Sequence, residues 1–299
     1  MAVLQGFPVP DFDCFDDEDT LYDEPICCYS QPLSIITDED VTLCEKKGLV
    51  LDTATPIKCT ANSTVYTAKS PRDGKIFAVK FTDHKRRIQS EFSKRKQVKD
   101  SPYLLKSFAL QESPSKAMLQ MEFCENGDIR DLIMPENYIW KLIHDIGNAL
   151  YNLHSDGWMH LDVSPGNILV SKNCFKLSDF GTLARIGEFE EGMEGAGPYA
   201  SPEALAFPLS DFQVTQQTDI FSFGVCLLES ASGKAAPRGG SNGYSLLRND
   251  QIKLGQGEYT CWCSTELINV INSMLNSNPN KRPTSEDLIN LPQVKKYDL

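Results

Sequence analysis

The sequence predicts an α+β protein in two parts, the first rich in strands and the second, larger part rich in helices. In residues 49–123, short runs of β-branched and aromatic residues are separated by turn residues, which is typical of strands. Beyond Gly127 the apolar residues recur at helical spacing instead, in the order Ile139, Leu142, Ile143, Ile146, Leu150 and Leu153. This change of period indicates two lobes with a cleft between them.

The composition is that of a globular protein with an acidic surface. The chain has 299 residues, and 41% of them are hydrophobic, which is enough to form a proper core. Its 29 basic and 41 acidic side chains give a net charge of −12, which disfavours binding to nucleic acid or to an anionic membrane surface. The ten cysteines form no paired C-x-x-C knuckles with histidine partners, so we expect reduced thiols rather than disulfides or zinc ligands.

Neither a signal peptide nor a membrane span is visible in the sequence. The first residues, MAVLQGFPVP, lack both a basic region and a long apolar region. The apolar stretch at residues 221–228 is too short to cross a bilayer. We therefore expect an intracellular protein, in the nucleus or the cytoplasm, with no membrane partner.

The first 44 residues are expected to form an acidic, disordered segment. Residues 11–24 read DFDCFDDEDTLYDE, and such a run of carboxylates repels itself and stays solvated. The aromatic residues within it leave open a second interpretation, a docking peptide. Another acidic cluster, Asp38-Glu39-Asp40, precedes the first strand-like residues at 49–51.

The strand-rich part is predicted to cover residues 45–126, and the helix-rich part residues 127–299. The elements expected in the first part are a hairpin of strands 65–68 and 76–81 around the turn residues 71–74, a helix at 88–99 and a strand at 118–123. Besides the helix that begins near Ile139, the second part is expected to hold helices near 219–230 and 265–275.

Five short motifs follow one another along the chain. They are Ala78-Val79-Lys80 in a strand, His160-Leu161-Asp162 with Asn167 in the pattern H-x-D-x-x-x-x-N, Asp179-Phe180-Gly181, Ala200-Ser201-Pro202-Glu203, and Arg282, which is placed to pair with Glu203. Each motif is weak alone, but in this order and spacing they resemble a eukaryotic protein kinase domain. The resemblance implies a two-lobed α+β protein kinase fold, with a small β-rich N-lobe and a larger helical C-lobe.

Residues 51–294 resemble the Wee family of kinases more narrowly. Leu161 stands where most kinases carry arginine, and Wee-type sequences share such an apolar replacement. The stretches Glu191-Gly192-Met193-Glu194-Gly195, Pro237-Arg238-Gly239-Gly240 and Leu246-Leu247-Arg248-Asn249 are similar to Wee-type segments. Such kinases place an inhibitory phosphate on cyclin-dependent kinases, so the resemblance implies a tyrosine or threonine of a cyclin-dependent kinase as the substrate.

The resemblance also implies roles for the catalytic residues, with ATP and Mg²⁺ as cofactors. Asp162 would orient the substrate hydroxyl and accept its proton. Asn167 and Asp179 would hold Mg²⁺, which prefers oxygen ligands. Lys80 would bind the α- and β-phosphates, and Glu91 is the expected anionic partner of Lys80.

The adenine ring is expected to lie in an apolar sandwich with a few polar anchors. Val65 and Ala78 would cover one face of the ring and Leu169 the other. The backbone from Glu122 to Cys124 would bond the ring edge, and Met121 would stand at the back of the pocket.

Two departures from the kinase pattern put catalysis in doubt. The three places where a phosphate-covering loop carries glycine are Lys58, Thr60 and Ser63, whose side chains obstruct a close approach of backbone amides to phosphates. Ser164 stands where a lysine would contact the transferring phosphate. Loss of such a charged contact commonly costs a few kcal/mol, or about a hundredfold in rate.

Three interpretations remain open on the sequence alone. The first is an active, slow protein kinase, which the retained Lys80, Asp162, Asn167 and Asp179 favour. The second is a pseudokinase, a regulatory binding module, which the missing glycines and lysine favour. The third is a different chemistry on the same scaffold. Since Leu161 cannot pair with a phosphate as arginine does, we also expect that activation-loop phosphorylation is not required.

Overall fold

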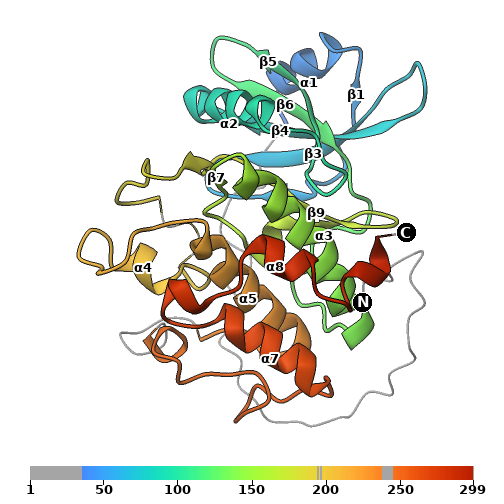
Figure 1. Cartoon of the computed structure of the whole chain (residues 1–299). Helices are drawn as coiled ribbons and strands as arrows, with labels where there is room; N and C mark the ends of the chain where they lie inside the picture. Colours follow the sequence, from blue (N-terminus) through green and yellow to red (C-terminus); the bar gives the residue numbers. More distant parts are fainter. Residues whose placement is uncertain (1–35, 194, 196, 238–244, 299) are drawn as a thin grey trace, which may run out of the picture. The chain divides into compact units, whose positions relative to one another are not determined.

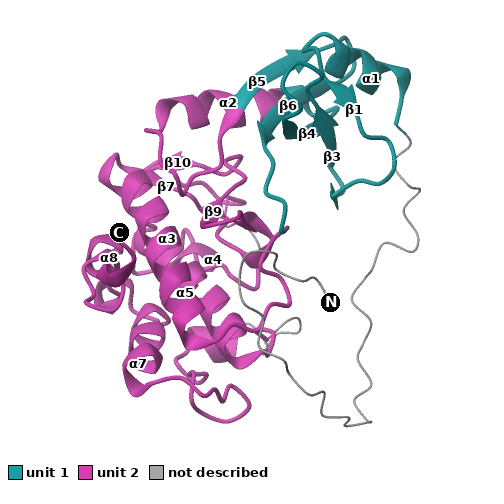
Figure 2. Cartoon of the chain, turned by 90° about the vertical axis from the view of Figure 1, so that its right-hand side faces the viewer, with its two compact units in different colours: residues 1–85, 108–126 teal, residues 86–107, 127–299 magenta. Residues whose placement is uncertain are grey.

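A computed structural model describes residues 36–193, 195, 197–237 and 245–298, and the structural statements below concern these residues. The chain forms two compact units (Figure 2). The first holds the described residues up to 85 together with 108–126, and the second holds residues 86–107 and the described residues from 127 onward. The acidic run at residues 11–24 lies outside the described residues.

The first unit is built on one antiparallel sheet. Its elements are helix α1 (Asp38–Glu45) and strands β1 (Val50–Leu51), β2 (Lys58–Cys59), β3 (Thr64–Lys69), β4 (Ile76–Thr82), β5 (Ser107–Glu112) and β6 (Ala117–Glu122), with the first residue of β5 counted in the second unit. The strand order is β1-β3-β4-β6-β5, and β2 pairs with β3. The predicted hairpin is confirmed as β3 and β4, while β2 and β5 are strands that the sequence did not indicate.

Helix α1 differs from the expectation that residues 1–44 are disordered. Thr37 and Asp40 form a reciprocal capping box that satisfies backbone N–H groups at the start of the helix. Asp40 also pairs with Lys116 at 2.8 Å. Leu43 and Cys44 are fully buried against Tyr66, Ala68, Val79 and Phe81 of the sheet. The helix forms because two apolar side chains reach a ready core, although carboxylates dominate its first turn.

Replacing Leu43 with alanine should therefore destabilise the protein. Leu43 has no exposed surface, so Leu43→Ala is expected to lower the free energy of unfolding by about 2–5 kcal/mol. Urea unfolding measures the change. The exposed neighbour Glu45 is the matched control, and Glu45→Ala should change the free energy of unfolding by no more than about 0.5 kcal/mol. Equal effects of the two substitutions would show that α1 is not part of the folded unit.

The second unit is mostly helical and surrounds α3. Its longer helices are α2 (Lys85–Gln97, whose first residue is counted in the first unit), α3 (Glu136–Ser155), α5 (Gln217–Ser232) and α7 (Thr265–Met274). The short elements are α4 (Pro202–Leu205), α8 (Ser285–Ile289), the 3₁₀ turns η1 (Pro165–Asn167), η2 (Pro279–Lys281) and η3 (Lys295–Tyr297), and the strand pairs β7 (Trp158–Met159) with β10 (Ala184–Arg185) and β8 (Ile168–Val170) with β9 (Phe175–Leu177). Figure 1 shows α5 and α8 alongside α3.

The helices expected from the sequence are present with shifted ends. The helix expected at 88–99 is α2, and the one beginning near Ile139 is α3, which starts three residues earlier at Glu136. The apolar residues of α3 that set its helical period are buried, which explains why the period predicted the helix. Helix α5 is buried almost all round, and Gly233 ends it in a left-handed conformation with φ of 68°.

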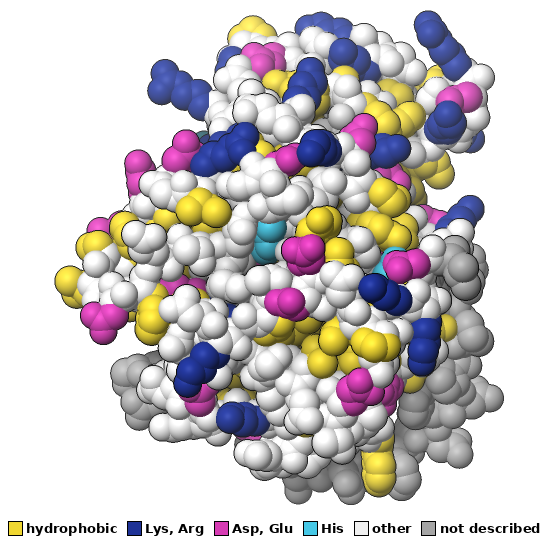
Figure 3. All heavy atoms as spheres, in the orientation of Figure 1, with side chains coloured by type: hydrophobic (Ala, Val, Ile, Leu, Met, Phe, Trp, Pro, Cys, Tyr) yellow, Lys and Arg dark blue, Asp and Glu magenta, His cyan; other side chains and the backbone are white. Residues whose placement is uncertain are grey.

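The surface carries charges of both signs. In the view of Figure 3, Lys and Arg side chains gather over α2, and acidic side chains are interspersed with basic ones elsewhere. Within the described ranges, none of the helices has both the length and the apolarity that crossing a bilayer requires.

Candidate active site

One face of the first unit's sheet holds the side chains predicted to contact a nucleotide. Val65 lies opposite Lys80, and Ala78 lies opposite Met121, in neighbouring antiparallel strands. Directly opposed residues point to the same side of a sheet, and so do residues two apart in one strand. Val65, Ala78, Lys80 and Met121 therefore share one face, whereas the core beneath α1 occupies the other face.

The other residues that are predicted to contact a nucleotide are divided between the two units. Glu122 and Cys124 follow Met121 at the end of β6 in the first unit, and Cys124 is 7% exposed. Leu169 lies on β8 in the second unit, where it is half-buried. Lys80 belongs to the first unit and Glu91 to the second, so their pairing stays a prediction.

The turn between β2 and β3 holds Thr60 and Ser63, two of the places where the kinase pattern predicts glycine. Its Thr60 accepts hydrogen bonds at Oγ1 from the N–H groups of Ser63, at 3.1 Å, and Asn62, at 3.4 Å. The Thr60 N–H donates to the Ser63 carbonyl at 2.9 Å. Thr82 of β4 donates from Oγ1 to the Asn62 carbonyl at 2.6 Å. The turn is therefore closed on itself and tied to the neighbouring strand.

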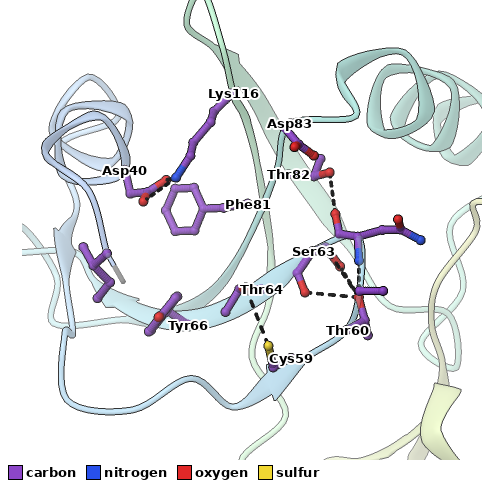
Figure 4. A pocket seen from close by; sticks show the side chains of 13 residues that line it. Asp40, Cys59, Thr60, Ser63, Thr64, Tyr66, Phe81, Thr82, Asp83 and Lys116 are labelled. Carbon is purple, nitrogen blue, oxygen red and sulfur yellow. Dashed lines mark hydrogen bonds and ion pairs between the residues drawn. The ribbon is translucent and has the colours of Figure 1, made fainter. Parts of the chain in front are cut away.

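A polar cavity of about 270 Å³ lies beside this turn (Figure 4). Residues 59–64 form one wall, and Tyr66, Phe81 and the Asp40–Lys116 ion pair form others. Tyr66 and Phe81 project from the face of the sheet opposite to Val65 and Lys80. This cavity is therefore not the predicted adenine pocket.

The catalytic loop of the second unit is anchored by a buried carboxylate. Asp219 of α5 accepts hydrogen bonds from the backbone N–H groups of His160 and Leu161, each at 2.8 Å, and lies 2.9 Å from Nε2 of His154. Leu161 has φ of 67°, a strained conformation for a branched side chain. The two charge-assisted bonds from Asp219 hold the backbone in that conformation.

These contacts also set the protonation state of Asp219. Burial alone would raise its pKa, but the hydrogen bond and charge of His154, with the charge and backbone N–H of His160, together lower the pKa below its ordinary value. A lowered folded-state pKa means that Asp219 contributes stability above its unfolded-state pKa. This contribution is lost as the pH falls through the folded-state pKa.

The predicted catalytic residues Asp162 and Asn167 and the predicted Mg²⁺ ligand Asp179 lie together in the second unit. The Asn167 Nδ2 group donates to the Asp162 carboxylate at 2.8 Å and to the Asp162 carbonyl at 3.0 Å. Asn167 directly precedes the β8–β9 hairpin, and Ser178, just after the hairpin, donates both its N–H and its hydroxyl to the Asn167 carbonyl. The next residue is Asp179, whose φ is 63°. The hairpin thus brings Asp179 back to Asn167 and Asp162.

These residues fit a Mg²⁺ ion. Because the Asn167 Nδ2 group donates to Asp162, the amide oxygen of Asn167 is the atom that can accept a cation. Together with the Asp179 carboxylate it supplies the hard oxygen donors that Mg²⁺ prefers, and the ion usually completes its shell with water and phosphate oxygens. Among the described residues no cluster of three or more His, Cys, Asp or Glu side chains forms a self-sufficient metal site.

The Asp179-Phe180-Gly181 segment is packed from both sides. Phe180 is buried against the ring of His160, with centroids 5.7 Å apart, and against the guanidinium of Arg95 on α2. Arg95 in turn donates to the carbonyls of Leu105 and Val98. A Cβ at Gly181 would lie 4.0 Å from the Glu91 carboxylate, so the buried Glu91 lies beside this segment.

Leu161 faces an apolar cluster rather than a phosphate. It packs with Met159, Ala184, Phe189, Ala204 and Val214. Leu161, which stands where the kinase pattern carries arginine, is thus a core residue. The expectation that no phosphorylated activation loop is needed is not tested by this packing. That expectation stays a prediction.

The segment that follows Asp179 contacts the catalytic loop at Gly195. Gly195 has φ of 66°, and a Cβ on it would collide with the Leu161 carbonyl oxygen and lie 3.2 Å from the Asp162 carboxylate. Only glycine fits this approach. Glu194 of the Wee-type stretch and residues 238–240 of Pro237–Gly240 lie outside the described residues.

Arg248 holds the end of the same segment. Its guanidinium donates to the carbonyls of Ala200, at 2.6 and 2.9 Å, and of Gly197, at 2.7 Å. Tyr199 donates from its hydroxyl to the Glu229 carboxylate at 2.8 Å. The predicted pair of Arg282 and Glu203 is confirmed as two bonds of 2.6 and 2.8 Å.

Ser164 leaves its place on the catalytic loop without a cation, but Arg130 lies near. A Cβ on Gly166 would lie 3.5 Å from the Arg130 Nε atom. Asp128 accepts two hydrogen bonds from this guanidinium, at 2.8 and 2.9 Å, and so raises the Arg130 pKa. Sequence reasoning missed Arg130 and Asp219, because no local pattern marks them. Gly195 and Arg248 were noted only as parts of Wee-type stretches.

Comparison with known families agrees with this geometry. The family described as "Protein kinase domain" matches residues 60–294. One similar protein is the "Membrane-associated tyrosine- and threonine-specific cdc2-inhibitory kinase wee-1.3" of Caenorhabditis elegans, which is 30% identical over 245 residues, or 78% of this chain and 35% of that protein.

Two further relatives carry related names. The "Mitosis inhibitor protein kinase mik1" of Schizosaccharomyces pombe is 26% identical over 77% of this chain and 42% of its own length. The "Wee1-like protein kinase" of Arabidopsis thaliana is 27% identical over 77% of this chain and 47% of its own length. The chain thus spans about a third to a half of the length of these relatives.

Proposed function

This chain belongs to the protein kinase family, and we propose that it transfers the γ-phosphate of ATP to a tyrosine or threonine of a cyclin-dependent kinase. The observation that supports transfer most directly is the convergence of Asp162, Asn167 and Asp179 on one anchored loop and hairpin. The substrate follows from similarity to kinases whose names specify cdc2 inhibition and tyrosine and threonine specificity.

The proposal gives each predicted residue the role expected from the sequence. Asp162 accepts the proton of the substrate hydroxyl, and the Asn167 amide fixes the orientation of its carboxylate. Asn167 and Asp179 would hold Mg²⁺, which would supply charge neutralisation for the phosphates. Lys80 binds the α- and β-phosphates, with Glu91 as its partner, and Val65, Ala78, Met121 and Leu169 enclose the adenine.

A second candidate is a nucleotide-binding pseudokinase. The closed turn at Thr60 favours this candidate, because the N–H groups of Asn62 and Ser63 already have an acceptor within the protein. Ser164 favours it too, since serine cannot neutralise a transferring phosphate.

Single-turnover phosphorylation of a cyclin-dependent kinase tests the proposal. The full chain is mixed in excess with the substrate and Mg²⁺-ATP, and phosphotyrosine and phosphothreonine are measured by mass spectrometry. A matched substrate with Phe and Val at the acceptor positions is the control. Incorporation that the control substrate loses supports the proposal. No incorporation by a folded, ATP-binding preparation, on this substrate or on generic acceptors, favours the pseudokinase.

A further inference from the structure

The turn between β2 and β3 has an internal acceptor for its own backbone amides. Thr60 Oγ1 lies 3.1 Å from the Ser63 N–H nitrogen and 3.4 Å from that of Asn62. Its hydroxyl proton is directed to Ser63, where the carbonyl oxygen and Oγ each lie 3.1 Å away. Figure 4 shows these bonds at the rim of the polar cavity.

The same turn is fixed from outside. The Asn62 carbonyl accepts from Thr82 Oγ1 at 2.6 Å, and Thr82 Oγ1 accepts from the His84 N–H at 3.0 Å. On both sides the turn continues into the paired strands β2 and β3, in which Lys58 lies opposite Val65 and Cys59 lies opposite Thr64. The turn is thus held in one conformation by contacts that do not involve a ligand.

Successive backbone N–H groups in a turn form a concave site that binds anions such as phosphate. Glycine in such a turn leaves the amides accessible and lets the backbone approach the phosphate closely. Here no glycine is present from Lys58 to Ser63, and a neutral hydroxyl stands where an anion would accept. A phosphate oxygen can take these two amides only if the Thr60 bonds break.

We propose that Thr60 is a specificity-determining residue of the nucleotide site, and that it withholds the Asn62 and Ser63 amides from the phosphates of the ligand. This inference rests on the proposed binding of a nucleotide. Its physical basis is competition: Thr60 Oγ1 satisfies the Asn62 and Ser63 amides in the free protein, so the phosphates gain little from them. The affinity for Mg²⁺-ATP should therefore come from the other predicted contacts and owe little to these two amides.

The test compares Thr60→Val with Thr60→Ser in the full chain. Valine has the shape of threonine without the hydroxyl, so the two amides lose their internal acceptor, whereas serine keeps it. Calorimetry measures the affinities for Mg²⁺-ATP and for adenosine. Thr60→Val should bind Mg²⁺-ATP about tenfold more tightly, as expected for new hydrogen bonds to a charged acceptor, with an unchanged affinity for adenosine. Thr60→Ser should match the original chain for both ligands.

Amide chemical shifts give a second readout that is independent of catalysis. In Thr60→Val, the Asn62 and Ser63 amide resonances should shift when Mg²⁺-ATP is added and should not shift with adenosine. The inference is overturned if Thr60→Val leaves the Mg²⁺-ATP affinity unchanged, if both affinities change equally, or if neither ligand binds.

Failure of the proposed kinase activity gives a different result. If the chain and its variants show the predicted affinities but the chain transfers no phosphate, the role of Thr60 is supported and the proposed catalytic function is wrong. If the chain transfers phosphate but Thr60→Val binds Mg²⁺-ATP like the original chain, the proposed function is supported and the inference about Thr60 is wrong.

Discussion

Replacing Asp162 with asparagine is expected to reduce phosphoryl transfer about a thousandfold, the contribution typical of a positioned general base. Asparagine keeps the shape of the side chain but cannot accept the proton of the substrate hydroxyl. The rate of the single-turnover reaction measures the change. Since the Asn167 Nδ2 group can still donate to the side-chain oxygen of the introduced asparagine, the loop should keep its conformation.

A matched control for this experiment is Asp156→Asn. Asp156 is the C-cap residue of α3 and pairs with Lys99 at 2.9 Å on the surface of the second unit, so its replacement removes the same charge without touching the site. Asp156→Asn should transfer phosphate at the original rate, and Mg²⁺-ATP affinity should stay the same in both variants. If Asp162→Asn retains a tenth or more of the activity, Asp162 is not the base.

Replacing Arg282 with methionine should have the largest effect on stability. The guanidinium makes two bonds to Glu203, donates to the carbonyls of Asn276 and Gln217, and lies 4.9 Å from the centroid of the Phe221 ring. Both side chains of the ion pair are at most 1% exposed. Methionine leaves the Glu203 carboxylate buried without its counter-ion, so the free energy of unfolding should fall by about 3–5 kcal/mol.

Urea unfolding of Arg282→Met and of Lys99→Met distinguishes the effect of losing a buried ion pair from the effect of losing an exposed one on the free energy of unfolding. Lys99 also forms an ion pair, but its side chain is 73% exposed, so its loss should change the free energy of unfolding by no more than about 1 kcal/mol. A similarly small effect of Arg282→Met would mean that the second unit relaxes to hydrate Glu203, and that the pair does not hold the segment after Asp179 in place.

The catalytic loop could be predicted because its chemistry is contiguous. Asp162 and Asn167 are five residues apart, and the bond between their side chains depends only on a short turn. The β8–β9 hairpin that returns Asp179 is equally local. Helix α3 was predictable because its buried apolar residues recur at helical spacing along one face. The hairpin β3–β4 was predictable because two β-rich runs flank a cluster of turn residues.

Helix α1 could not be predicted from local pattern. Its residues are acidic and few, and its formation depends on burying Leu43 and Cys44 against strands that come later in the chain. The ends of α2 and α3 shifted for a related reason, since capping and tertiary packing decide where a helix begins.

By itself, the sequence determined the two-part α+β organisation and the order of the motifs that assign the chain to the protein kinase family. It also revealed the missing glycines and the serine at position 164. The tertiary structure decided what those substitutions do. Thr60 accepts from its own turn, Asp219 reaches His160 across 59 residues, and Arg248 reaches Ala200 across 48. The physical reason is that period and turn chemistry act over a few residues, whereas hydrogen bonds to buried partners depend on which distant segments fold together.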